Sequence, residues 1–83
     1  MNTDQILEEL LEFLSSNFLV ERDDIDLDRS LVDQGVIDSL GLTEISAHLG
    51  RAHGVKVEPS EMNQQNFGSV RRIVDFVLRK SAT

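Results

Sequence analysis

The sequence predicts an all-α fold: a small bundle of three main helices plus one short helix, with a long ordered loop after the first helix. Three observations predict it. Apolar residues recur at helical spacings of three and four in three stretches. Residues that favour helix starts stand before these stretches, and beyond residues 55–57 nothing has the two-residue period of a strand. With 83 residues, we expect residues 1–83 to form a single domain.

The first predicted helix covers residues 4–18. Thr3 is the expected N-cap, and acidic side chains near the start suit the positive end of the helix dipole. The spacing places one apolar stripe along the helix, made of Ile6, Leu7, Leu10, Leu11, Leu14 and Phe18.

The segment 21–37 has no sustained period, yet aliphatic residues are spread along it. A polar linker has no need of so many apolar side chains. We therefore expect an ordered loop that is anchored to the core by these residues, which are Ile25, Leu27, Leu31, Val36 and Ile37.

Asp38 and Ser39 open the second predicted helix, and Gly54 suits its C-terminal cap. Its expected buried stripe is Leu42, Ile45, Leu49 and Ala52. Residues 55–57 then read as extended, and residues 59–62 as a short helical turn with Pro59 near its beginning.

Ser69 is the expected N-cap of the last helix, and Arg79 and Lys80 complement the negative end of its dipole. The three-four spacing returns here in Val70, Ile73, Val74, Val77 and Leu78.

Charge and composition exclude several functions. The chain has a formal net charge of -7 and no cysteine, which argues against nucleic-acid partners, anionic membranes, disulfides and thiol nucleophiles. Residues 1–44 hold twelve acidic and two basic residues, so this half is suited to attracting a basic partner. The longest apolar run has three residues and the amino terminus lacks a signal pattern. We expect a cytoplasmic protein.

The closely spaced aspartates of the loop raise the possibility of a calcium site. With Asp24, Asp26 and Asp28 as the first three ligands, Arg29 would fall where the turn needs glycine and Gly35 where a bidentate glutamate is required. A solvated acidic loop is the better interpretation.

Two other chemistries also fit poorly. His48 and His53 are five residues apart, so on one helix they project roughly 140° from each other, and a zinc site would need carboxylate ligands that no suitable spacing supplies. A triad of Ser39, Asp38 and a histidine lacks the strand-turn-helix elbow that exposes a nucleophilic serine. We therefore expect no metal and no catalytic residue.

The segment Gly35–Leu40 leads directly into the second helix. An Asp-Ser pair before an apolar helix often does no more than cap it. A serine hydroxyl at a helix start, however, projects into solvent beside unpaired backbone N–H groups, which suits an attached phosphodiester. Both interpretations remain open on these residues alone.

Three segments in order make the chain resemble the acyl carrier protein family. They are residues 31–40 followed by Glu44–Ile45, then Gly54–Val57, and finally residues 67–77. By this resemblance Ser39 is the attachment point of a 4′-phosphopantetheine arm derived from coenzyme A. Asp38 would cap the helix and help a phosphopantetheinyl transferase to position its substrates. The arm's thiol would hold an acyl or aminoacyl group as a thioester, and the protein itself would not be an enzyme.

The resemblance also implies partners and a docking face. An adenylating ligase or acyltransferase would load the cargo, and synthase or tailoring enzymes would use it, with the chain itself expected to be a monomer. The outward residues of the second helix would form the docking face: Leu40, Thr43, Glu44, Ala47 and Arg51. Gly41 stands where the family usually has an acidic residue, and Thr43 where an aliphatic one is common.

The glycine after Asp-Ser-Leu and the segment from Asn66 to Val70 resemble stand-alone carriers of secondary metabolism more than a fatty-acid carrier. The alternative from another class is a carrier-like bundle that is never modified and acts as a regulatory or structural interaction subunit.

Overall fold

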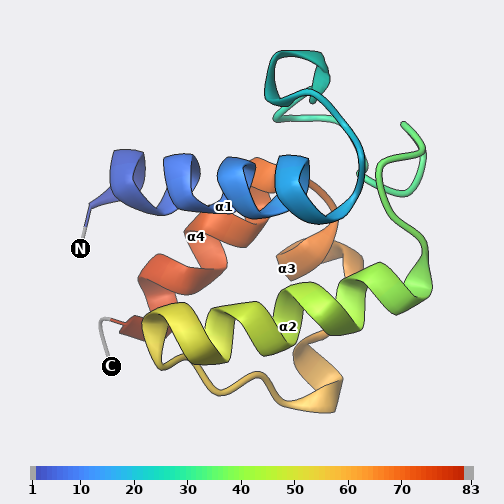
Figure 1. The fold of residues 1–83 in the computed structure, drawn as a ribbon. Helices are drawn as coiled ribbons and strands as arrows, with labels where there is room; N and C mark the ends of the chain where they lie inside the picture. Colours follow the sequence, from blue (N-terminus) through green and yellow to red (C-terminus); the bar gives the residue numbers. More distant parts are fainter. Residues whose placement is uncertain (1, 82–83) are drawn as a thin grey trace.

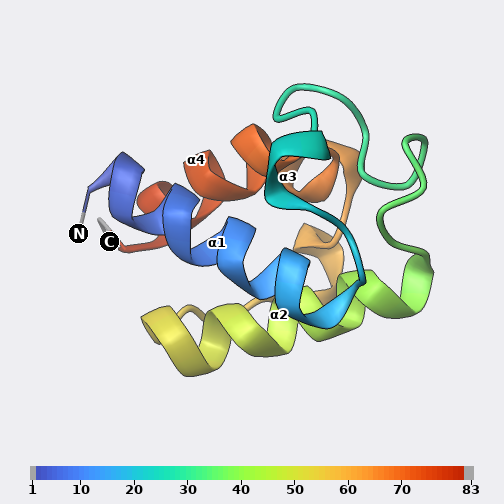
Figure 2. The ribbon, with the colours of Figure 1, turned by 45° about the horizontal axis from the view of Figure 1, so that its top comes forward.

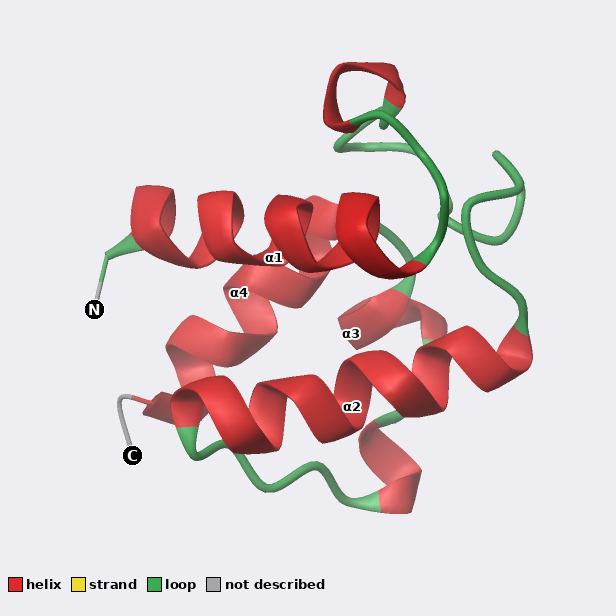
Figure 3. Ribbon diagram, in the orientation of Figure 1, coloured by secondary structure: helices red, strands yellow, loops and turns green. Residues whose placement is uncertain are grey.

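The computed structural model of the chain describes residues 2–81. Its α-helices are α1 (Thr3–Asn17), α2 (Ser39–His53), α3 (Gln64–Phe67) and α4 (Val70–Ser81), and its 3-10 turns are η1 (Arg22–Asp24) and η2 (Pro59–Glu61). No strand occurs within residues 2–81, as the red and green ribbon of Figure 3 makes plain. The all-α prediction and its three main helices are confirmed, whereas the single short helix is in fact two elements, η2 and α3.

The helices enclose a core between α1, α2 and α4. In Figure 1, α1 and α2 run in opposite directions, and α4 crosses behind them. The long segment between α1 and α2 leaves the end of α1 and turns back to the start of α2, so the two main helix ends nearest this segment lie on the same side of the molecule (Figure 2). The fold therefore gathers the end of α1, the loop and the start of α2 into one region.

The start of α1 differs from the prediction by one residue. Asn2, not Thr3, is the N-cap: its side-chain oxygen accepts a hydrogen bond from the Gln5 N–H at 2.8 Å. The Gln5 side chain in turn accepts from the Asn2 N–H, which completes a capping box. Thr3 is the first residue of the helix because only Asn2 has this reciprocal partner three residues on.

The long loop is anchored as predicted. Leu31 is fully buried, and its N–H donates to the Gly68 carbonyl at 3.0 Å. The loop also bonds to α4 through Leu27, whose carbonyl accepts from the Arg71 N–H at 3.0 Å. Burial of the aliphatic anchors holds an otherwise polar segment against the bundle; Ile25 and Ile37 are buried with Leu31, while Leu27 and Val36 pack partly buried against the core.

The buried stripe of α2 is shifted toward the start of the helix relative to the predicted one. Ile45 and Leu49 are fully buried as expected, but Ala52 is exposed and Leu42 is only partly buried. Gly41, in the first turn, is buried in addition. At ~100° per residue, Gly41 and Ala52 project only about 20° apart on α2. The buried stripe therefore begins earlier than predicted and ends before the last turn of the helix. The left-handed cap at Gly54, with φ 67°, is as predicted.

A glutamate on α1 joins the two histidines of α2. Glu9 Oε1 lies 2.6 Å from His48 Nε2, and Glu9 Oε2 lies 3.1 Å from His53 Nε2. The first contact is a hydrogen bond, whereas the second is close but not aligned as one. His48 also stacks on Phe13, with ring centroids 4.0 Å apart. The histidines thus converge on one carboxylate and serve the packing of α1 on α2.

The last helix starts as predicted, with the Ser69 hydroxyl accepting a hydrogen bond from the Arg72 N–H at 3.2 Å. Near its end, Lys80 Nζ binds both carboxylate oxygens of Glu61, at 3.0 and 3.1 Å. A hydrogen bond from the Glu58 N–H, together with Lys80, lowers the pKa of Glu61 below its usual value. This pair ties the short η2 turn to α4.

Candidate functional site

The start of α2 is built by Asp38. Its backbone is extended, and its Oδ1 accepts a hydrogen bond from the Gly41 N–H at 2.9 Å. Its own carbonyl accepts from the Leu42 N–H at 3.3 Å. Aspartate is favoured here both as a hydrogen-bonding cap and as a negative charge at the positive helix end. Asp38 therefore carries out the capping of α2, as predicted.

Because the Asp38 side chain caps α2, the Ser39 side chain is not needed as the cap. Ser39 is the first residue of α2 and is exposed. Its hydroxyl forms no hydrogen bond with any other residue of the described chain. Ser69 is the instructive contrast, since it also stands at a helix start but is 3% exposed and uses its hydroxyl as the cap. The structure therefore distinguishes an accessible helix-start serine from a structural one.

The backbone around Ser39 suits an attached phosphate. The first N–H groups of an α-helix have no intrahelical acceptor, and the helix dipole makes this end positive. Asp38 engages the Gly41 N–H, whereas the N–H groups of Ser39 and Leu40 donate to no group within residues 2–81. A phosphodiester on the Ser39 hydroxyl would lie beside these donors. The residues present therefore fit a 4′-phosphopantetheine arm at this position.

Gly41 is required by packing. A Cβ at this position would lie 2.8 Å from Ile37 Cβ and 3.2 Å from Phe18 Cε1. The end of α1 and the loop therefore close directly onto the first turn of α2. This explains why glycine replaces the acidic residue that the family usually has here, a reason that sequence reasoning missed because Phe18 is 23 positions away in the chain.

All five residues of the predicted docking face are exposed. Leu40 is 72% exposed, which is unusual for a leucine. Glu44 is the single acidic residue of this face and Arg51 the single base. The remaining members, Thr43 and Ala47, are small and solvent-facing. The surface is therefore nearly neutral along α2, and the acidic residues lie mainly before it.

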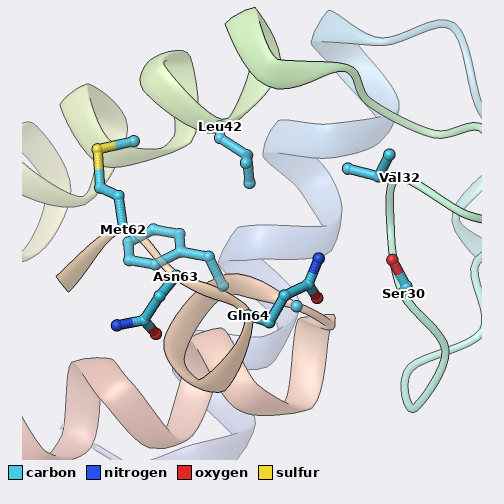
Figure 4. Close-up of a pocket in the computed structure, with 8 residues that line it drawn as sticks. Ser30, Val32, Leu42, Met62, Asn63 and Gln64 are labelled. Carbon is cyan, nitrogen blue, oxygen red and sulfur yellow. The ribbon is translucent and has the colours of Figure 1, made fainter. Parts of the chain in front are cut away.

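Two cavities flank the start of α2. One, of about 170 Å³, lies between α2, α3 and the loop; in Figure 4, Ser30 and Val32 face Met62 and Asn63 across it, and Leu42 enters from α2. The other is an open hollow of about 480 Å³ at the end of α1, lined by Asn17, Phe18, Leu40, Gly41, Glu44 and the loop residues 35–38. Ser39 itself lines neither, but its two chain neighbours, Asp38 and Leu40, both line the open hollow.

Neither a metal-binding cluster nor a membrane-spanning helix occurs in the part of the chain that the structure describes. No group of three or more histidine, cysteine, aspartate or glutamate side chains in residues 2–81 could hold a metal ion. None of the helices in this range has the length and apolarity needed to cross a membrane. Asp28, one of the aspartates considered as a calcium ligand from the sequence, forms an ion pair with Arg71 at 2.6 Å.

The structure is a small helical bundle that presents an exposed serine at a capped helix start. Comparison with known proteins establishes the family. The model for the phosphopantetheine attachment site matches residues 8–77. The chain therefore belongs to this family of acyl carrier proteins: it is a carrier and not an enzyme, and its cargo is held on a 4′-phosphopantetheine arm.

Individual relatives are similar over most of their length. The D-alanyl carrier protein of Abiotrophia defectiva is 32% identical over 73 residues, covering 88% of this chain and 89% of the relative. That of Streptococcus uberis is 33% identical over 70 residues, covering 84% and 87%. A chain in the crystal structure of an FAD-dependent dehydrogenase superposes with a TM-score of 0.70 at 28% identity, covering 82% of this chain and 97% of that one. Family membership implies a phosphopantetheinyl transferase and a ligase as partners in general.

Proposed function

We propose that Ser39 carries the 4′-phosphopantetheine arm and that Asp38 positions it for the transferase. The observation that supports this most directly is that Asp38 caps α2 by accepting a hydrogen bond from the Gly41 N–H at 2.9 Å. The Ser39 hydroxyl is therefore left exposed and unbonded. In the transfer reaction the Ser39 oxygen attacks the β-phosphorus of coenzyme A. The P–O bond to the nucleotide breaks, and adenosine 3′,5′-bisphosphate leaves while the serine proton passes to a base of the transferase.

The arm supplies a thiol that forms thioesters, chemistry that this cysteine-free chain lacks. The chain's own residues hold the phosphate end at the helix N-terminus, through the N–H groups of Ser39 and Leu40. The partner enzymes carry out bond making and breaking on the cargo. On this proposal Ser39 is a modified residue and has no catalytic role.

We further propose that the face of Leu40, Thr43, Glu44, Ala47 and Arg51 meets these partners. All five residues are exposed and lie on the helix that begins with Ser39. An adenylating ligase or acyltransferase and the synthase or tailoring enzymes would dock here in turn. Long-range attraction would come from the acidic residues before α2, because residues 1–44 hold twelve acids and two bases.

The experiment is arm transfer followed by intact mass. Purified apo-protein is incubated with coenzyme A, magnesium and a broad-specificity phosphopantetheinyl transferase, and the mass should rise by one arm. Ser39→Ala should abolish the gain. Ser60→Ala is the matched control, since Ser60 is an exposed serine in the η2 turn, and it should be loaded like the wild type. A gain that survives Ser39→Ala would overturn the assignment.

The cargo is a separate part of the proposal. Two relatives are D-alanyl carrier proteins, and we therefore propose small aminoacyl groups as the first cargoes to test. A stand-alone carrier loaded by an adenylating ligase stays our prediction. We place this carrier in the cytoplasm, because the transfer of the arm consumes coenzyme A, which is available there. Mass spectrometry of protein from the producing cells, with the thioester kept intact, identifies the cargo; recovery of wholly unmodified protein bound to one partner would favour the interaction-subunit alternative.

A further inference from the structure

Leu19 has a conformation and an environment that do not suit a leucine. It follows the C-cap of α1, Phe18, and has φ 54°. Among residues 2–81 it is the one non-glycine residue with positive φ. The same side chain is 99% exposed, so it adds nothing to the core.

Folding alone would select another residue at this position. The left-handed conformation brings the Cβ of an L-residue close to the following carbonyl oxygen, so glycine or asparagine usually takes the place after a helix end. A fully exposed leucine also gains no burial in return for this strain. Strained residues that the fold does not need mark functional positions more often than others. The folded chain alone therefore does not explain a leucine at position 19, and we look for the explanation in a partner.

The location of Leu19 indicates what that reason is. The two residues before it, Asn17 and Phe18, line the open hollow of about 480 Å³ at the start of α2. Leu40, which is 72% exposed, lines the same hollow and is the neighbour of Ser39. At the corner where α1 ends and α2 begins, Leu19 thus directly follows two residues that line the hollow, and Leu40 lines it.

The charges around this corner indicate the chemistry of a partner. Asp38 and Glu44 line the hollow, and neither carboxylate forms an ion pair within residues 2–81. An enzyme that binds coenzyme A must hold several phosphates and is therefore basic around its site. It must also approach Ser39 in the apo-protein, before any arm or cargo is present. The hollow complements such an enzyme in charge and in position.

We propose that Leu19 is a docking residue for the phosphopantetheinyl transferase, which covers Leu19 and Leu40 with an apolar surface and sets basic groups beside Asp38 and Glu44. This inference rests on the proposed role of Ser39. It adds a contact just after the C-terminal end of α1 to the docking face on α2. It assigns this contact to the transferase, which acts on the apo-protein before any other partner.

Steady-state arm transfer tests this role. Initial rates are measured with purified transferase and saturating coenzyme A over a range of apo-protein concentrations. Leu19→Gly and Leu19→Asn should raise KM by about tenfold or more with kcat unchanged, because a lost apolar contact removes ground-state and transition-state binding equally. Their thermal midpoints should be equal to that of the wild type or higher, because both residues accept the left-handed conformation. Leu19→Met should keep the wild-type KM.

Val32→Asn is the matched control. Val32 is an exposed apolar residue, 45% exposed, that lines the other cavity, and its variant should keep KM within about twofold of the wild type. An equal rise in KM for both positions would overturn the assignment to this corner, and so would an unchanged KM for Leu19→Gly and Leu19→Asn. If the wild type and the Leu19 variants all take up the arm equally well, only the role of Leu19 is contradicted. If the wild type takes up no arm, the Ser39 proposal is contradicted as well.

Discussion

Replacing Gly41 by alanine tests the contact between α1, the loop and the start of α2. The added Cβ would lie 2.8 Å from Ile37 Cβ and 3.2 Å from Phe18 Cε1, closer than packed atoms normally approach. Forcing one extra carbon into a packed site costs about 1–3 kcal/mol. Alanine recovers about 1 kcal/mol because it favours a helix over glycine. We therefore expect Gly41→Ala to lower the free energy of unfolding by up to about 2 kcal/mol.

Gly50 in the same helix is the matched control. It is exposed, and the nearest atom to an added Cβ would be the Val55 carbonyl oxygen at 3.5 Å, an ordinary contact. Gly50→Ala should therefore stabilise the protein by about 0.5–1 kcal/mol. Urea or thermal unfolding of both apo variants separates the two effects, with about 4–8 °C of midpoint per kcal/mol for a domain of this size. If Gly41→Ala were as stable as Gly50→Ala, the packing of Phe18 on α2 would be contradicted.

Two further predictions concern charges. Glu44→Lys should raise the KM for arm transfer while the far-UV circular dichroism stays unchanged, because Glu44 is exposed and its charge faces the partner rather than the core. Glu61→Gln should reduce stability at neutral pH and make it less dependent on pH. The pKa of Glu61 is lowered in the folded state, so its stabilisation is present above the unfolded pKa and is lost as the pH falls through the folded one.

Each of these has a direct check. Glu44→Lys is measured beside Arg51→Ala, which leaves the acidic charge in place, and a fall in its thermal midpoint would mean that Glu44 supports the fold. For Glu61→Gln, thermal unfolding is followed from neutral to acid pH. The difference from the wild type should disappear in acid, and a difference that is constant across the range would show that the ion pair with Lys80 has no part in stability.

The main helices could be predicted because their information is local. A three-four apolar spacing, a serine at position 69 and a glycine at position 54 each act within a few residues, and the structure confirms all of them. The anchored loop followed from the same reasoning, since Leu31 and its aliphatic neighbours could be placed only in the core. The exposed serine behind an aspartate cap was likewise visible in the sequence.

The remaining features depend on partners that are distant in the chain or on competition between neighbours. Asn2 and Thr3 are both good caps, and the side chain of Gln5 decides between them. The four-residue helix α3 buries only Phe67, so it has no period to detect. Ala52 lies on the buried face of α2 by its spacing but in the last turn, and the spacing does not show how far along a helix the core extends. The meeting of Glu9 with both histidines could not be foreseen, since a helical wheel places residues on one helix but does not show what the neighbouring helix brings to them.

The central claim is that residue 39 bears the arm, and site mapping in the native protein tests it most directly. Cleavage after Arg29 and Arg51 releases a peptide of residues 30–51 that contains Ser30, Ser39 and Ser46. Fragmentation of this peptide from protein recovered from the producing cells should place the phosphopantetheine on Ser39. An arm on either of the other two serines, both of which are partly buried, would contradict the account.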